Sequence, residues 1–164
     1  MKGLLVAWLF VLCAPARALD GVSLEGGAGS HDMSLVRVAA QWNQRIDWLA
    51  ARRWELYWDA SFGGWHGDAG TIYDLGLTPV FRYPASSRGW YGEAGIGLHY
   101  LSDKHIASDL DFSTNFQFGD HAGFGYRFAD WELSARLQHL SNAGIRNPNP
   151  GINFLILRLQ YLLR

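Results

Sequence analysis

Two residues in the last third of the chain, His139 and Ser141, have the types and spacing of a general base and a nucleophile. In a β-strand, side chains two positions apart point to the same face, so the pair shares one face. The strand rise separates them by roughly 7 Å along the strand, a gap that side-chain reach can close. An imidazole beside a hydroxyl is the arrangement that activates serine to attack a carbonyl carbon. The pair therefore predicts a serine hydrolase.

The segment that carries this pair, residues 131–141, alternates as a half-buried strand does. One set of alternating residues is apolar until it ends in the histidine and the serine: Trp131, Leu133, Ala135, Leu137, His139 and Ser141. The other set is mostly polar: Glu132, Ser134, Arg136, Gln138 and Leu140. The nucleophile and the base thus stand on an apolar strand face, which is the useful side for an enzyme whose substrate is a lipid.

The first 18 residues predict a secretory signal peptide. Lys2 supplies a short positive region, and residues 3–13 form an apolar stretch that is too short to cross a bilayer as a helix. Ala16 and Ala18 supply the small residues that a signal peptidase requires, so we expect cleavage after Ala18. Residues 19–164 would then form a single exported domain.

The composition of this exported domain excludes several classes of protein. Its only candidate thiol, Cys13, leaves with the signal, so neither a disulfide framework nor a cysteine nucleophile is expected. The 14 basic residues of the chain become 12 without Lys2 and Arg17, against 15 acidic residues. A domain with this negative balance lacks the basic surface that nucleic acid binding requires. The remaining histidines show no spacing typical of a zinc site.

Alternating segments run through the whole exported domain and predict eight strands. They span residues 22–30, 34–42, 54–65, 72–83, 90–101, 116–128, 131–141 and 153–163. In an exported chain rich in glycine and aromatic residues, this pattern is typical of an eight-stranded antiparallel transmembrane β-barrel in a Gram-negative outer membrane. Alternation alone leaves a soluble periplasmic lipid-binding barrel open, because it does not say which face points inward. Aromatic residues near the strand ends and glycines on the charged face favour the membrane barrel.

The residues around the catalytic pair also resemble a known family. The hexapeptide 139–144, His-Leu-Ser-Asn-Ala-Gly, followed by Pro-Asn-Pro-Gly at 148–151, resembles the PagL family of outer-membrane lipid A 3-O-deacylases. Weaker similarities lie at residues 57–60, 93–97 and 123–125. The resemblance implies a barrel whose catalytic residues face lipid and which hydrolyses the ester at the 3 position of lipid A in lipopolysaccharide. It implies no metal and no organic cofactor.

Carried over residue by residue, the resemblance makes Ser141 the nucleophile and His139 the general base. It also implies an oxyanion hole formed by Asn142 and by the backbone N–H of Gly144, although both residues are also ordinary turn formers. Such donors typically contribute on the order of 3 kcal/mol to transition-state stabilisation.

One position departs from the family pattern. Where the family has a triad glutamate, this chain has Asn153, which can orient an imidazole but cannot supply negative charge. A second candidate follows from the hairpin at residues 129–130, whose short turn places Asp120 opposite His139. Asp120 lies on the apolar face of its strand, where a carboxylate is costly without a partner. We expect Asp120 to orient or charge-balance His139, with Asn153 as the second candidate.

The sequence leaves other functions open. One alternative is a small barrel without catalysis that serves adhesion or envelope stability. The absence of the family's glutamate at position 153, where this chain has Asn153, is the observation that most favours it. A phospholipase or an acyltransferase could use the same nucleophile with a different acyl donor or acceptor. The sequence also leaves a homodimer in the outer-membrane lipid open.

Overall fold

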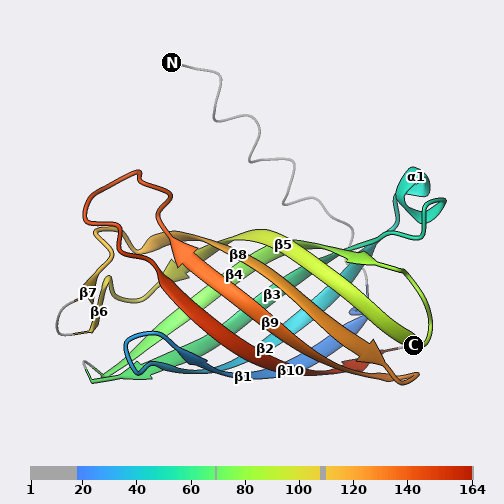
Figure 1. Ribbon diagram of the computed structural model, residues 1–164, viewed down its shortest axis with the longest axis horizontal. Helices are drawn as coiled ribbons and strands as arrows, with labels where there is room; N and C mark the ends of the chain where they lie inside the picture. Colours follow the sequence, from blue (N-terminus) through green and yellow to red (C-terminus); the bar gives the residue numbers. More distant parts are fainter. Residues whose placement is uncertain (1–17, 69, 108–109, 164) are drawn as a thin grey trace, which may run out of the picture.

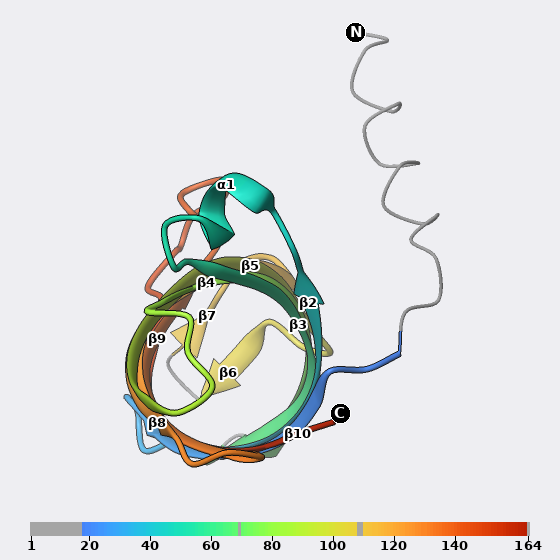
Figure 2. The same cartoon turned by 90° about the vertical axis from the view of Figure 1, so that its right-hand side faces the viewer.

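The computed structural model describes residues 18–68, 70–107 and 110–163 (Figure 1). The predicted signal peptide, residues 1–18, lies outside this part of the chain except for Ala18, so its cleavage stays a prediction. The described residues contain the whole of the predicted barrel strands, and they form a closed ring when viewed along the barrel axis (Figure 2).

Eight strands build the barrel, and each pairs with its neighbours in antiparallel register. Around the barrel their order is β1, β10, β9, β8, β5, β4, β3, β2. Their bounds are β1 (Gly21–Gly29), β2 (Ser34–Gln44), β3 (Glu55–Gly67), β4 (Gly70–Tyr83), β5 (Gly89–Leu101), β8 (Phe116–Arg127), β9 (Trp131–Ser141) and β10 (Ile152–Leu162). The predicted fold class is therefore confirmed, and no predicted strand end differs from the observed one by more than two residues.

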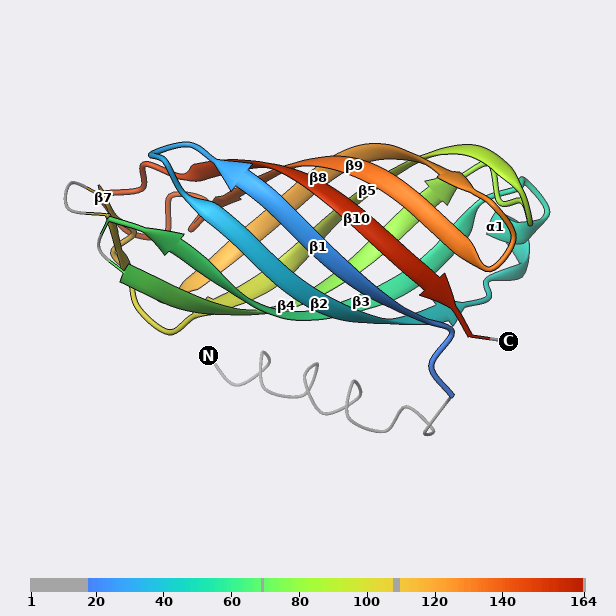
Figure 3. The same ribbon diagram turned by 90° about the horizontal axis from the view of Figure 1, so that it is seen from below.

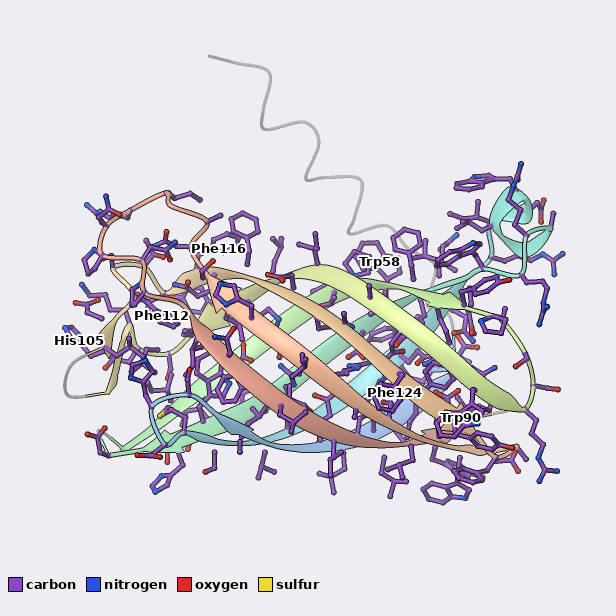
Figure 4. All side chains as sticks on the ribbon, in the orientation of Figure 1. Trp58, Trp90, His105, Phe112, Phe116 and Phe124 are labelled. Carbon is purple, nitrogen blue, oxygen red and sulfur yellow. The ribbon has the colours of Figure 1, made fainter. Side chains whose placement is uncertain are left out.

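The barrel presents its apolar side chains outward and its charges inward. On β9, Leu137 is 67% exposed whereas the adjacent Arg136 is 3% exposed, and β10 repeats the pattern with Leu157 and Arg158. A soluble barrel would turn the bulky set inward, so this arrangement contradicts the soluble alternative. A continuous exposed apolar band is the surface that a lipid bilayer covers. Aromatic side chains mark both ends of the band, with Phe116 near one end and Trp90 near the other (Figure 4).

Buried ion pairs fill the middle of the barrel. Arg136 contacts Glu25 at 3.0 Å and Glu93 at 2.7 Å, and Arg82 contacts Glu93 at 3.1 Å. The hydroxyl of Tyr57 donates to Glu93 at 2.7 Å. Buried charges are tolerated only when they are paired and hydrogen-bonded, and this network satisfies that condition. The interior is thus a packed polar core that holds the wall rigid, as expected of a narrow eight-stranded barrel.

Loss of one arginine from this core is expected to destabilise the barrel strongly. Arg136→Met would remove one of the arginines that neutralise Glu25 and Glu93, and breaking buried pairs in this way typically costs about 3 kcal/mol. The temperature at which the folded barrel loses its anomalous gel mobility should fall. Arg45→Met is the matched control, because the Arg45 side chain is 81% exposed and its pairing contributes little. Equal melting of both variants would contradict a stabilising role for the network.

The connections at the two ends of the barrel differ. One end carries the longest connection, residues 102–115, together with residues 142–151, and the short strands β6 (His105–Ala107) and β7 (Leu110–Asp111) lie in the longest one. The other end carries α1 (Asp47–Ala50) and the two ends of the described chain, residues 18 and 163 (Figures 1 and 3). Outer-membrane barrels place long loops outside and short turns in the periplasm, so the end with β6 and β7 is extracellular. None of the described helices is long and apolar enough to cross a membrane.

An apolar plug closes the extracellular end from inside. Phe112 and Ile106 of the 102–115 connection are fully buried, and they pack with inward residues of the strands. The strand residues of this cluster include Leu140 and Ile152, which flank the catalytic segment on its inner face. The end of β9 is therefore supported from below by a dense core, which positions the side chains that it presents outward.

Candidate active site

Three neighbouring strands bring His139 between the two proposed partners. On β9, His139 pairs with Asp120 of β8 on one side and with Asn153 of β10 on the other. The first pairing is the one predicted from the short β8–β9 turn. All three side chains belong to the outward-facing sets of their strands, and Asp120 and Asn153 are exposed. Cross-strand neighbours on one face have Cβ atoms about 4.5–5.5 Å apart, so the three groups form one polar row on an apolar wall.

Asn153 makes the hydrogen bond that sets the orientation of the His139 ring. The Nδ1 atom of His139 lies 2.8 Å from Oδ1 of Asn153. An amide oxygen accepts only, so Nδ1 carries the proton and Nε2 keeps its lone pair. That is the tautomer that a general base requires. The structure thus places Asn153, rather than the favoured Asp120, on this nitrogen, while the catalytic role of each residue stays a prediction.

The His139 ring fits against Gly151 because Gly151 has no side chain. A Cβ at Gly151 would lie 2.6 Å from Cε1 and 3.1 Å from Nε2 of His139, and Gly151 has a φ of +70°. Gly151 directly precedes Ile152, which pairs with Leu140, so it stands beside the end of β9 where Ser141 lies. The Nε2 edge of the ring is therefore on the side of Ser141.

Substitution of Gly151 should displace the base without touching the nucleophile. In Gly151→Ala, the added Cβ would push the imidazole by several tenths of an ångström, and its positive φ would also be strained. A displacement approaching 1 Å can cost on the order of 100-fold in rate, so we expect kcat/KM for ester hydrolysis to fall by about that factor. Gly89→Ala is the matched control, because Gly89 also has a positive φ, its added Cβ would meet no atom within 4 Å, and it begins β5 at the other end of the barrel. Wild-type activity in Gly151→Ala would show that the ring is not held as observed.

Ser141 ends β9 on the same outward face as His139 and is half-buried. The chain then turns sharply, with Ala143 and Gly144 at φ values of +53° and +76°. The backbone N–H of Ala143 is 3.4 Å from Oγ of Ser141. Gly144 follows in the same turn, three residues after Ser141, and is exposed.

Asn142 points inward and ties two extracellular connections together. Its Nδ2 donates to the carbonyl oxygens of Phe112 at 3.0 Å and Arg146 at 2.9 Å, so both amide hydrogens are in use. Its backbone N–H donates to Oδ1 of Asn149 at 2.9 Å. In this arrangement the Asn142 amide supports the turn. The sequence did not reveal Gly151, Phe112 or Asn149, because each acts through a contact across a long connection.

A groove of about 460 Å³ runs along the outer wall beside the polar row. Asp120, His139 and Asn153 line it, together with apolar residues one row nearer the membrane centre, which include Ala122, Leu137 and Leu155. A polar row next to an apolar channel suits a substrate with a polar linkage and a hydrocarbon chain. Within the described residues, no group of three or more histidine, cysteine or acidic side chains could hold a metal ion.

Comparisons with known proteins match this chain to one family. A family model described as lipid A 3-O-deacylase (PagL) matches residues 36–162. The lipid A deacylase PagL of Pseudomonas aeruginosa is 33% identical over 155 residues, which cover 90% of this chain and 88% of the relative. The protein of the same name from Bordetella bronchiseptica is 31% identical over 95% of this chain and 92% of the relative.

A solved structure of the outer membrane enzyme PagL superposes on the barrel with a TM-score of 0.77. The match is 29% identical and covers 87% of this chain and 99% of that structure. The family model spans well over half of the chain, and both relatives exceed 30% identity over most of their length. This chain is therefore an outer-membrane β-barrel that belongs to the lipid A 3-O-deacylase (PagL) family.

Proposed function

We propose that this protein hydrolyses the ester that attaches the acyl chain at the 3 position of lipid A, with Ser141 as nucleophile and His139 as general base. The observation that carries the proposal is the polar row on the lipid-facing wall. There Asn153 holds Nδ1 of His139 and leaves Nε2 on the side of Ser141. Membership of the PagL family supplies the substrate, because the two matched relatives are both named lipid A deacylases.

The reaction would run as two acyl transfers. Nε2 of His139 takes the hydroxyl proton of Ser141 as Oγ attacks the ester carbonyl carbon. The tetrahedral intermediate collapses, the bond to the sugar oxygen breaks, and the imidazolium returns its proton to that oxygen. Water, deprotonated by the same imidazole, then attacks the acyl-serine and releases the fatty acid. The imidazolium then gives its proton to the departing Oγ of Ser141, so the enzyme is regenerated and the reaction consumes only water.

The turn after Ser141 supports stabilisation of the oxyanion. A backbone N–H in an exposed turn next to the nucleophile can donate to the developing charge, and Gly144 has this position. Because the amide of Asn142 already donates to two carbonyl groups, its contribution in this arrangement is to hold the turn. Asp120, across from His139 on β8, would stabilise the imidazolium by its charge.

The groove beside the row accounts for a lipid substrate. The small side chain of Ala122 forms the floor of the groove, and Leu137 and Leu155 line the groove on the side nearer the membrane centre. An acyl chain laid here stays in contact with protein and bilayer, while its ester lies level with His139. The site lies at the extracellular end of β9. This end is in the outer leaflet, where lipopolysaccharide resides.

Mass spectrometry of lipid A tests the proposal. Cells that express the protein should contain lipid A lighter by one 3-linked hydroxyacyl group, and cells with an empty vector should not. Purified protein should release that fatty acid from lipid A in detergent and leave substrate that already lacks the 3-linked chain unchanged. Unmodified lipid A in both assays, with a folded barrel in the membrane, would contradict the proposal. Fatty acid release from phospholipids alone would assign a phospholipase instead.

A further inference from the structure

A second groove lies on the outer wall of β4, β5 and β8, nearer the periplasmic end. Its floor is made of two small outward residues, Gly92 and Ala94, which follow each other on the outer face of β5, and Asp120 of β8 lies at its upper end beside Ile96. A Cβ at Gly92 would find its nearest neighbours only at 3.9 Å. Phe81 and Tyr83 of β4 form one side. Because Gly92 and Ala94 are much smaller than Phe81 and Tyr83 beside them, they leave a trench in the wall.

The β2–β3 connection closes the periplasmic end of this trench. Trp48 and Leu49 of α1 line it, as do Arg52 and Trp54 just beyond the helix. Viewed along the barrel axis, α1 lies outside the ring of strands rather than over the lumen (Figure 2). The Trp54 ring packs on Tyr83, with centroids 5.1 Å apart, which fixes the connection to the wall. Trp48 nevertheless remains 61% exposed.

The connection is also basic. Three arginines, Arg45, Arg52 and Arg53, stand against a single acid, Asp47, and all four are exposed. Asp47 pairs with Arg45 at 3.1 Å, which leaves Arg52 and Arg53 without a counter-charge from this connection. Among the described residues, Arg52 donates once, from Nη1 to the carbonyl of Trp48 at 3.0 Å. A guanidinium has five N–H donors in a fork that matches a phosphate, so donors remain for such a ligand.

We propose that this groove binds one phospholipid of the periplasmic leaflet, with its phosphate on Arg52 and one acyl chain in the trench over Gly92 and Ala94. An arginine beside exposed tryptophans at the periplasmic rim is the chemistry of a lipid headgroup site. The trench rises from Gly92 to Ile96, about 13 Å along a strand that is tilted by ~40°, which gives a depth of about 10 Å in an apolar band of ~25 Å. It therefore spans most of one leaflet. The upper end of the trench reaches Asp120, which also lines the groove beside His139, whereas the headgroup end lies at the opposite end of the barrel from Ser141.

Native mass spectrometry of the purified barrel, titrated with phosphatidylglycerol in detergent, tests the site. The wild type should retain one lipid. Arg52→Ala should bind about fivefold more weakly, the effect of one charge near a lipid phosphate. Gly92→Leu should bind at least tenfold more weakly, because it fills the trench. Lys104→Ala, at the extracellular end, and Gly26→Leu, on the outer face of β1, are the matched controls and should bind as the wild type does.

Two further probes identify the ligand chemistry. Diacylglycerol with the same chains should bind at least fivefold more weakly than phosphatidylglycerol, and inorganic phosphate at equal concentration should not displace the lipid. Ala94→Leu repeats the steric test if Gly92→Leu does not fold. Equal retention by the wild type and both groove variants, equal binding of diacylglycerol, or a dimer in place of bound lipid would overturn the proposal.

Discussion

Replacement of Ser141 by alanine is expected to lower the rate of 3-O-acyl ester hydrolysis by at least about 10⁴-fold while leaving the barrel folded. In serine hydrolases the nucleophile and its base act as a unit, and loss of the hydroxyl removes the covalent route altogether. Ser141 ends β9 on the outer face and its Oγ takes part in no buried network, so little stability should be lost. Fatty acid release from purified lipid A measures the rate, and gel mobility before and after heating measures folding.

The matched control for this variant is Ser34→Ala, which removes another exposed hydroxyl at the same end of the barrel. It should retain wild-type activity. His139→Asn should be as inactive as Ser141→Ala, and the double variant should lose no more than either single one, because the two residues serve the same step. Substantial activity in Ser141→Ala would move the nucleophile to another residue and end the mechanism proposed above.

Replacement of Asn153 by alanine should reduce kcat by roughly 10³-fold. This loss is smaller than the loss of about 10⁴-fold that follows when the charged residue of a Ser-His-Asp triad is replaced by an amide. The reason is the 2.8 Å contact from Nδ1 of His139 to the Asn153 amide, which fixes both the tautomer and the direction of Nε2. Asn153→Asp keeps the acceptor and adds a charge that stabilises the imidazolium. It should therefore retain or exceed the wild-type rate.

The comparison with Asp120 decides between the two partners of His139. Asp120 faces the imidazole across the β8–β9 ladder and acts through space, so Asp120→Ala should cost only about tenfold, with the larger effect at low salt. Pre-steady-state release of the sugar product separates the acylation step from deacylation in both variants. A larger loss in Asp120→Ala than in Asn153→Ala would restore Asp120 as the main positioning residue.

Much of this barrel can be predicted from sequence because its strands are regular. Strict alternation identifies a strand and its two faces without any tertiary information, and the predicted ends fall within two residues of the observed ones. The pairing of Asp120 with His139 is predictable for a related reason. The β8–β9 connection is a tight turn closed by the hydrogen bond from Phe128 N–H to the Trp131 carbonyl, and a tight turn determines the register of both strands.

Other features follow only from contacts across long connections. The sequence favours Asp120 over Asn153 because an amide supplies no charge, although Asn153 holds the His139 ring. The β9–β10 connection, residues 142–151, is too long to predict the register that places Asn153 beside His139. The same length hid the contact of Gly151 with that ring and the inward turn of Asn142. Nothing in the residues 45–54 indicates that they fold back over the outer wall of β4 and β5.

The sequence by itself determined the strands, the chemical identity of the catalytic pair and the fact that the pair stands on an apolar face, because these depend on residue type and on a period of two. Only the tertiary structure decided that this face is the outer one. Closure of the barrel leaves an interior that four buried arginines and their acids fill, so the apolar set must point outward. Barrel closure also places β8 and β10 on either side of β9. As a result His139 lies between Asp120 and Asn153, and Asn153 makes the hydrogen bond that orients its ring.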